Sequence, residues 1–94
     1  MAYISKSDLL FVKTFDVCPQ CLYGDIVSST SSFWYHKTRV CEIEPMGPLG
    51  FIQPNTTYSF TEHWWLFPYQ YPVDKKTNTA ELKAIIHNCK MNQR

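Results

Sequence analysis

The sequence predicts an α+β fold, in which a small antiparallel β-sheet of three to five strands carries one C-terminal amphipathic helix packed on it. Short apolar and aromatic runs, separated by turn-forming residues, fill most of the chain before residue 72 and are typical of strands. One apolar stripe at helical spacing lies near the C-terminus. With 45% hydrophobic and 18% charged residues, the chain of 94 residues has a globular composition, and we expect a single domain over residues 1–94.

The first strand is expected over residues 9–17, LLFVKTFDV, because this run is rich in aromatic and β-branched residues. It places Phe11, Phe15 and Val17 on one face, interrupted by Lys13. The preceding SKSD has the composition of a helix cap, but the run after it favours a strand.

The middle of the chain predicts turns, strands and one irregular loop. After the turn CPQCLYGD, a short strand is expected over residues 26–29, IVSS. Residues 33–44, FWYHKTRVCEIE, predict either one long strand or two strands with a bend at HKTR. Residues 45–55, PMGPLGFIQPN, contain three Pro and two Gly, a density that neither a ladder nor a helix tolerates, and so predict an irregular loop.

The last strand is expected over residues 56–67, TTYSFTEHWWLF, where large apolar residues fall on alternate positions with one interruption. One face of this strand would carry Tyr58, Phe60, Trp64 and Leu66, with Glu62 among them. The turn-forming PYQYP after it ends the strand.

The C-terminal segment NTAELKAIIHNCK predicts an amphipathic helix over about residues 79–91. Asn78 stands three residues before Glu81, which is the spacing of a capping box. A single apolar stripe continues at positions i, i+3, i+4 and i+7, formed by Leu82, Ile85, Ile86 and Cys89. We therefore expect this stripe to face the sheet.

The stretch DVCPQC contains two cysteines that a single turn can point the same way, as structural zinc sites require. The best-spaced ligand set for zinc is Cys18, Cys21, His36 and Cys41. In one straight strand His36 and Cys41 point to opposite faces, because their separation is odd, so the site requires a bend at HKTR. The alternative is that the pair is two plain thiols in a turn.

The motif CPQC, entered from a strand, is similar over four residues to the CPYC of glutaredoxins, and this implies a thiol oxidoreductase as an alternative function. Redox catalysis needs the cysteine pair at a helix N-terminus, where the helix dipole lowers the thiol pKa. The next segment, LYGDIVSSTSS, is a poor helix former. No Gly-rich phosphate loop or nucleophile motif occurs in the sequence, so we expect no enzyme.

Aromatic residues make up 16% of the chain, and Trp and Tyr dominate the hot spots of protein interfaces. The candidates for partner binding are Trp34, Tyr35, Trp64, Trp65, Tyr69 and Tyr71. The competing interpretation is that these side chains build the core of a small domain. Stacking on nucleic acid wants basic residues among the aromatic ones, and only Lys37 and Arg39 lie close to them in sequence.

Charge is uneven along the chain. Residues 1–74 carry four Lys or Arg against seven Asp or Glu, a net −3, whereas residues 75–94 carry five against one, a net +4. Such a basic segment is typical of a solvated helix face, and it also suits an acidic protein partner or a nucleic acid. No run is long enough for a signal peptide or a membrane span, so we expect a cytoplasmic protein with reduced cysteines.

These features together predict a small intracellular protein-binding module, stabilised by zinc, that acts as an inhibitor or an adaptor. Phage or mobile elements encode compact domains of this kind, and homo-oligomerisation is left open. The alternatives are a nucleic-acid-binding zinc domain and a thiol oxidoreductase that uses the CPQC pair.

Overall fold

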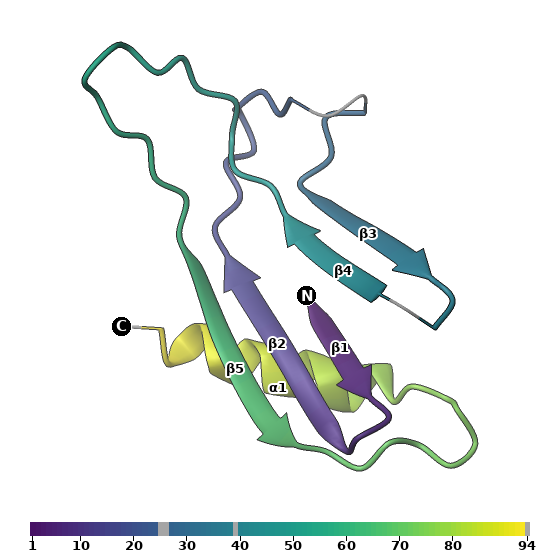
Figure 1. The fold of residues 1–94 in the computed structure, drawn as a ribbon. Helices are drawn as coiled ribbons and strands as arrows, with labels where there is room; N and C mark the ends of the chain where they lie inside the picture. The colour runs from purple at the N-terminus through teal and green to yellow at the C-terminus, as the bar shows by residue number, and fades with distance from the viewer. Residues whose placement is uncertain (25–26, 39, 94) are drawn as a thin grey trace. The chain divides into compact units, whose positions relative to one another are not determined.

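The computed structural model describes residues 1–24, 27–38 and 40–93. The elements are β1 (Ala2–Ser5), β2 (Leu9–Phe15), β3 (Ser31–His36), β4 (Val40–Pro45), β5 (Glu62–Pro68) and α1 (Thr79–Met91) (Figure 1). Three strands form one antiparallel sheet in the order β1-β2-β5, and β3 pairs with β4 in a second. The predicted α+β class, with its antiparallel strands and one C-terminal helix, is confirmed.

The chain forms two compact units. Unit 1 is discontinuous in sequence and consists of Met1–Thr14 and Glu62–Arg94. It contains β1, most of β2, β5 and α1. Unit 2 is the intervening Phe15–Thr61, which contains the β3–β4 hairpin and the cysteine turn.

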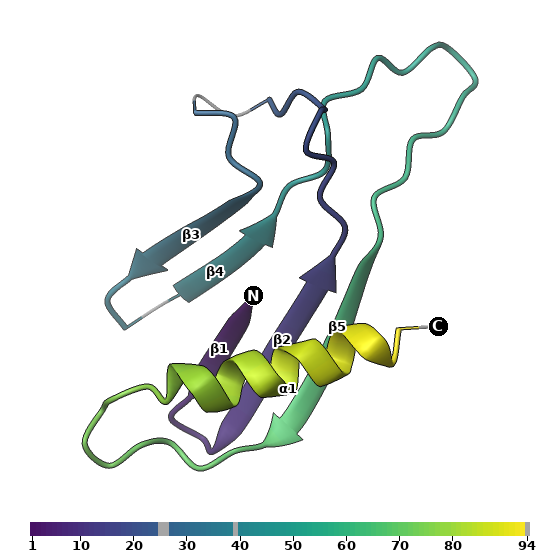
Figure 2. The same cartoon turned by 180° about the vertical axis from the view of Figure 1, so that it is seen from behind.

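The core of unit 1 is built on β2, the central strand of its sheet. Along this strand the side chains of Leu10, Val12 and Thr14 are buried, and the alternate residues are only partly so. This period of two is the pattern of a strand that turns one face to a core. Leu10 and Val12 are fully buried, because strands flank β2 on both sides and α1 packs over this face (Figure 2).

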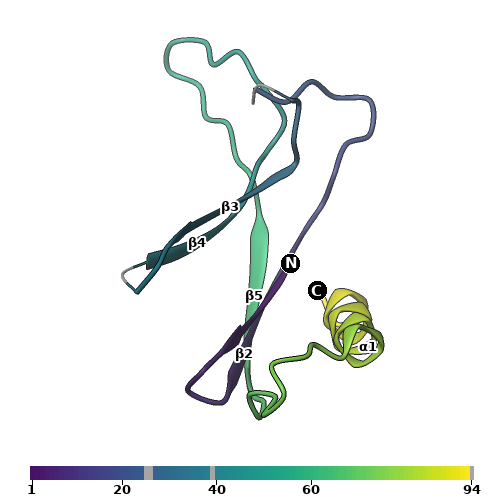
Figure 3. The same cartoon turned by 90° about the vertical axis from the view of Figure 1, so that its right-hand side faces the viewer.

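Helix α1 begins as the sequence predicts. The Asn78 side chain accepts a hydrogen bond from the backbone N–H of Glu81 at 3.2 Å, which satisfies one of the free N–H groups of the first turn. Glu81 in the first turn and Lys90 in the last have the signs that the helix dipole favours. The helix lies on one side of the strands β2 and β5 (Figure 3). The predicted stripe packs on the sheet, with Cys89 buried in the core and Leu82, Ile85 and Ile86 partly buried around it.

The segment after β5 is tied to the β1–β2 turn through Asp8. Asp8 has a positive φ of 57°, its carbonyl accepts from Tyr69 N–H at 2.9 Å, and its carboxylate accepts from Tyr71 N–H at 2.8 Å. The Tyr69 hydroxyl donates to Glu81 at 2.8 Å, and this hydrogen bond raises the pKa of Tyr69. The β1–β2 turn thus fixes the path of the chain as it leaves β5 for α1.

In unit 2, residues 33–44 form two strands rather than one, so of the two alternatives for this segment the one with a bend at HKTR holds. The strands β3 and β4 pair antiparallel from Ser31 opposite Pro45 to His36 opposite Val40. Residue 39, within the connection, lies outside the described residues.

The loop after β4 is irregular, as its proline content predicts. Residues 46–61 are all described, and none of them lies in a strand or a helix. The rings of Tyr58 and Phe60 lie so close over Gly50 and Gly47 that a Cβ there would meet ring atoms at 3.1 and 3.0 Å. The Tyr58 hydroxyl also donates to the carbonyl of Pro48 at 2.6 Å. Aromatic side chains from one end of the loop therefore hold the other end.

This packing corrects the prediction of a strand over residues 56–67. The strand begins only at Glu62, because Tyr58 and Phe60 pack on loop glycines instead of joining a ladder. The strand predicted over residues 9–17 likewise ends at Phe15. The sequence interpretation missed β1, and of the segment 26–29, residues 27–29 are not strand while residue 26 lies outside the described ranges.

We expect Ile85→Ala to lower the free energy of unfolding by about 2 kcal/mol or more, since truncating a packed Ile typically costs 2–5 kcal/mol. Ile85 contacts the Leu10–Val12–Cys89 core from α1. Lys83→Ala, at an exposed position of the same helix, is the matched control and should change stability by less than about 0.5 kcal/mol. Urea titrations measure both, and equal midpoints for the two variants would contradict this packing.

Candidate functional site: aromatic surfaces and the cysteine turn

The open sheet face of unit 1, formed by Tyr3, Phe11, Trp64 and Leu66, is the face of the three-stranded sheet opposite α1. These side chains alternate with the core residues along their strands, so they point away from the helix. Trp64 is 64% exposed, and Tyr3 and Leu66 are also exposed. The result is an aromatic and aliphatic surface that unit 1 does not use for its own core.

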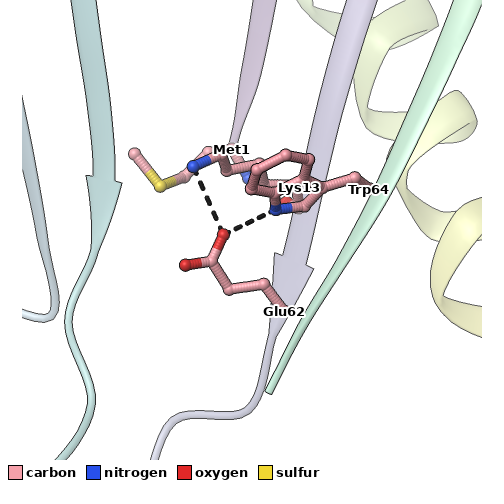
Figure 4. Close-up of polar contacts among 4 residues, drawn as sticks. All are labelled: Met1, Lys13, Glu62 and Trp64. Atoms are coloured by element: carbon pink, nitrogen blue, oxygen red, sulfur yellow. Dashed lines mark hydrogen bonds and ion pairs between the residues drawn. The ribbon is translucent and has the colours of Figure 1, made fainter. Parts of the chain in front are cut away.

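Trp64 is exposed, yet its indole is held by three neighbours, two of which, Lys13 and Glu62, are drawn in Figure 4. Its Nε1–H donates to Glu62 Oε2 at 2.7 Å. The Lys13 ammonium lies 4.8 Å from the centre of the indole and forms an ion pair of 3.2 Å with the same carboxylate oxygen. The ring of Phe11 meets the indole edge to face, with 5.6 Å between centroids. A hydrogen bond, a cation–π contact and a ring contact thus fix one exposed tryptophan.

Lys13 and Glu62 are charged residues that each interrupt an apolar strand face in the sequence, and in the structure they form an ion pair with each other. Lys13 interrupts the Phe11–Phe15 face of β2, and Glu62 stands two residues before Trp64 on β5. The structure pairs them across neighbouring strands. The sequence did not lead us to predict that Lys13 and Glu62 hold Trp64. The signal that could have revealed it is that Glu62 and Trp64 are two residues apart and therefore lie on the same face of the strand.

The β3–β4 hairpin of unit 2 carries a second set of exposed aromatic residues. Phe33 and Tyr35 lie on one face, with Tyr35 opposite Cys41, and Tyr35 is 70% exposed. Trp34, which is 51% exposed, lies on the other face, where its ring stacks on His36 at 6.1 Å. Both faces of this two-stranded ribbon therefore present aromatic side chains to solvent.

The structure divides the six aromatic candidates for partner binding. Three are exposed, namely Trp34, Tyr35 and Trp64. Trp65 and Tyr69 are partly buried and pack against the core of unit 1, and Tyr71 is partly buried beside β1. Trp65 and Tyr69 are therefore part of the core, whereas Trp34, Tyr35 and Trp64 stay candidates for partner binding.

Cys18 and Cys21 lie on one turn and form a disulfide, with 5.3 Å between their Cα atoms, which corrects the expectation of reduced cysteines for this pair. The Cys21 N–H donates to the carbonyl of Cys18 at 3.2 Å, which closes the turn. The Cys18 N–H donates to the hydroxyl of Tyr23 at 3.0 Å, and Tyr23 is buried. The turn is therefore anchored at its start, while Cys21 at its end is exposed.

The structure brings together two of the four residues of the hypothetical zinc site. Tyr35 pairs with Cys41 and His36 pairs with Val40, so His36 and Cys41 point to opposite faces of the hairpin. Within the described ranges, no group of three or more His, Cys, Asp or Glu could hold a metal. Because zinc binds thiolates and not disulfide sulfurs, this arrangement does not fit a zinc site, and zinc stays a prediction for the reduced chain.

The other two cysteines differ in exposure. Cys41 is an exposed free thiol on β4, and Cys89 is a buried free thiol on α1. Removal from water raises the pKa of Cys89, so its thiol stays protonated at neutral pH. His87, two residues before Cys89, is exposed, which agrees with the opposite directions expected for this pair on a helix.

Comparisons with models of protein families, with curated proteins and with solved structures found no match. Among the residues that the structure describes, no helix combines the length and the apolar character that crossing a membrane requires. The function of the chain must therefore be inferred from its own side chains.

We expect the number of reactive thiols in the air-oxidised protein to differ between its folded, unfolded and reduced forms. One thiol, Cys41, should react rapidly in the folded protein, and a second, Cys89, only after unfolding. Reduction before unfolding should release two more from the Cys18–Cys21 bond. Ellman titration under the three conditions measures this.

The Cys41→Ser variant, which should show no rapid thiol, is the control for the assignment. Three or four rapidly reacting thiols in the folded, unreduced protein would contradict the disulfide. Metal analysis of the same samples shows whether the reduced form takes up zinc.

Proposed function

We propose that this protein is a small protein-binding module that docks a partner on the open sheet face around Trp64. The observation that carries the proposal is that Trp64 is 64% exposed and at the same time fixed by Glu62, Lys13 and Phe11. An exposed tryptophan that is already ordered loses little side-chain entropy when a partner covers it. Trp is also the residue most enriched among the hot spots of interfaces.

The neighbours of Trp64 support the same function. Leu66 and Tyr3 extend the apolar surface along the strands, and the Lys13–Glu62 pair places both charge signs at the side of the indole. An apolar centre with polar groups beside it is the usual anatomy of a protein interface. A small domain whose distinguishing features are such surfaces suits an inhibitor or an adaptor in the cytoplasm.

The β3–β4 hairpin provides a second surface for the same role. Isolated two-stranded hairpins are marginally stable in water, and this one has exposed aromatic residues on both faces. A partner that covers Trp34 or Tyr35 would stabilise the hairpin as it binds. The two surfaces belong to different units, so substitutions in each can be tested separately.

We expect Trp64→Ala to weaken partner binding by about thirtyfold, or roughly 2 kcal/mol, because truncation of a tryptophan hot spot typically costs at least that much. The loss of folding stability should be smaller, since Trp64 lies outside the core of unit 1. Affinity capture and mass spectrometry identify the partner, and calorimetric titration of the purified partner measures the affinity.

Two variants serve as controls for this experiment. Val73→Ala removes an exposed apolar side chain outside the open sheet face and should bind like the wild type. Trp34→Ala tests the hairpin surface. If Trp64→Ala binds the partner as tightly as Val73→Ala does, the open sheet face is not the docking surface.

One observation favours a second candidate function, thiol–disulfide exchange at the CPQC turn. Cys21, one of the two residues of the Cys18–Cys21 disulfide, is exposed, so a substrate thiolate can approach the disulfide. Two substrate thiols would be oxidised to a disulfide as the Cys18–Cys21 bond is reduced to two thiols. Oxidation of a reduced test peptide by the wild type, and none by Cys21→Ser, is the test.

A further inference from the structure

Unit 1 contains a groove of about 420 Å³ between β5 and α1. Its floor and walls are mainly apolar and include Leu10, Trp65, Phe67 and Ile85, with Cys89 among them. The exposed residues Asn88 and Asn92 of the helix side stand at its margin. The size falls within the range of about 300–1,000 Å³ that is typical of ligand pockets.

The strand beside this groove is an open edge. In the sheet order β1-β2-β5, β5 has β2 on one side, and no described strand pairs with its other side. Glu62 and Pro68, which are residues of the kind that protects an edge from pairing, stand at the two ends of β5, and the five residues between them, HWWLF, contain no Lys, Asp, Glu or Pro. The outward N–H and C=O groups of residues 63–67 are therefore available to another extended chain.

We propose that an extended segment of a partner protein adds to the outer edge of β5 as a fourth strand and places a large apolar side chain in the groove. The two observations complement each other, because alternate side chains of an added strand point to the same face as Trp65 and Phe67, where the groove lies. Main-chain pairing supplies affinity in such complexes, and the pocket supplies specificity.

The helix side of the groove is uncharged. It is formed by Ile85, Asn88, Cys89 and Asn92, whereas Lys83 and Lys90 lie on the opposite face of α1. The bound segment is therefore specified by its apolar anchor and by its backbone pairing. This site is distinct from the open sheet face, and the inference does not rest on the docking role of Trp64.

A second copy of this chain fits the groove less well than a partner segment does. If two β5 strands paired edge to edge, the side chains aimed at the neighbour's groove would be Trp65 and Phe67. Both already pack against the core of their own unit. Pairing of this kind would leave the groove empty, whereas a separate peptide has a free side chain to fill it.

The probe for the site is a phage-displayed library of random peptides of about nine residues, long enough for one strand. It is selected against the whole protein. We expect enriched peptides with one large apolar residue at a fixed position. Asn88→Trp, which fills the groove margin, should weaken binding of the enriched peptide by at least about tenfold, while His87→Trp, an exposed neighbour outside the groove, should not.

Backbone pairing is tested with two synthetic versions of the enriched peptide, N-methylated on complementary sets of alternate residues. Only one version should retain binding, because a strand pairs through only one of its two edges. Trp64→Ala should bind the peptide as the wild type does, which keeps this result separate from that of the open sheet face.

Failure to enrich any peptide that distinguishes the wild type from Asn88→Trp would overturn the proposal. Equal binding of both N-methylated versions would also overturn it. A dimer in sedimentation experiments that Asn88→Trp dissociates would replace the partner segment with a second copy of the chain.

Discussion

The burial of Leu10 and Val12 beneath α1 is the interaction on which unit 1 depends. These two side chains of the central strand are fully buried, and the helix reaches them through Ile85, Ile86 and Cys89. The two neighbouring strands cover the sides of β2 through Ile4 of β1 and Trp65 of β5, among others. The largest fully buried side chains of this small core, Leu10, Val12 and Thr14, therefore all lie on one face of one strand.

The burial of Leu10 and Val12 also determines which side chains lie on the opposite face of the sheet. Because side chains alternate along a strand, placing Leu10 and Val12 under the helix forces Phe11 and Lys13 to the other side. There they meet Trp64 and Glu62 of β5. The arrangement that fixes the exposed indole is thus a consequence of core parity, and a one-residue slip of β2 would destroy the core and the surface together.

The sequence was most informative where local signals agree. The Asn78 cap, Glu81 and the Leu82–Cys89 stripe predicted α1 correctly, and the alternation in residues 9–15 predicted β2. It was wrong about residues 56–61, because Tyr58 and Phe60 have the alternation of a strand but pack on Gly50 and Gly47, a tertiary contact that the local pattern does not reveal.

For the candidate sites, sequence patterns identified the residue types better than their partners. The aromatic excess pointed correctly to Trp64, Trp34 and Tyr35 as exposed side chains, but not to the Lys13–Glu62 pair, whose register depends on two strands far apart in sequence. The CxxC spacing predicted that Cys18 and Cys21 share a turn. It could not distinguish a disulfide from a metal site, because both require the two cysteine side chains to point the same way from one turn.

Amide hydrogen exchange of the free protein, monitored by NMR, tests most directly the claim that β2 is the core strand and β5 an open edge. The account predicts the slowest exchange in β2, and along β5 an alternation between slow amides bonded to β2 and fast amides pointing outward. Uniformly slow exchange along β5 in the free protein would mean that its edge is already covered. Faster exchange in β2 than in β5 would contradict the assignment of the core.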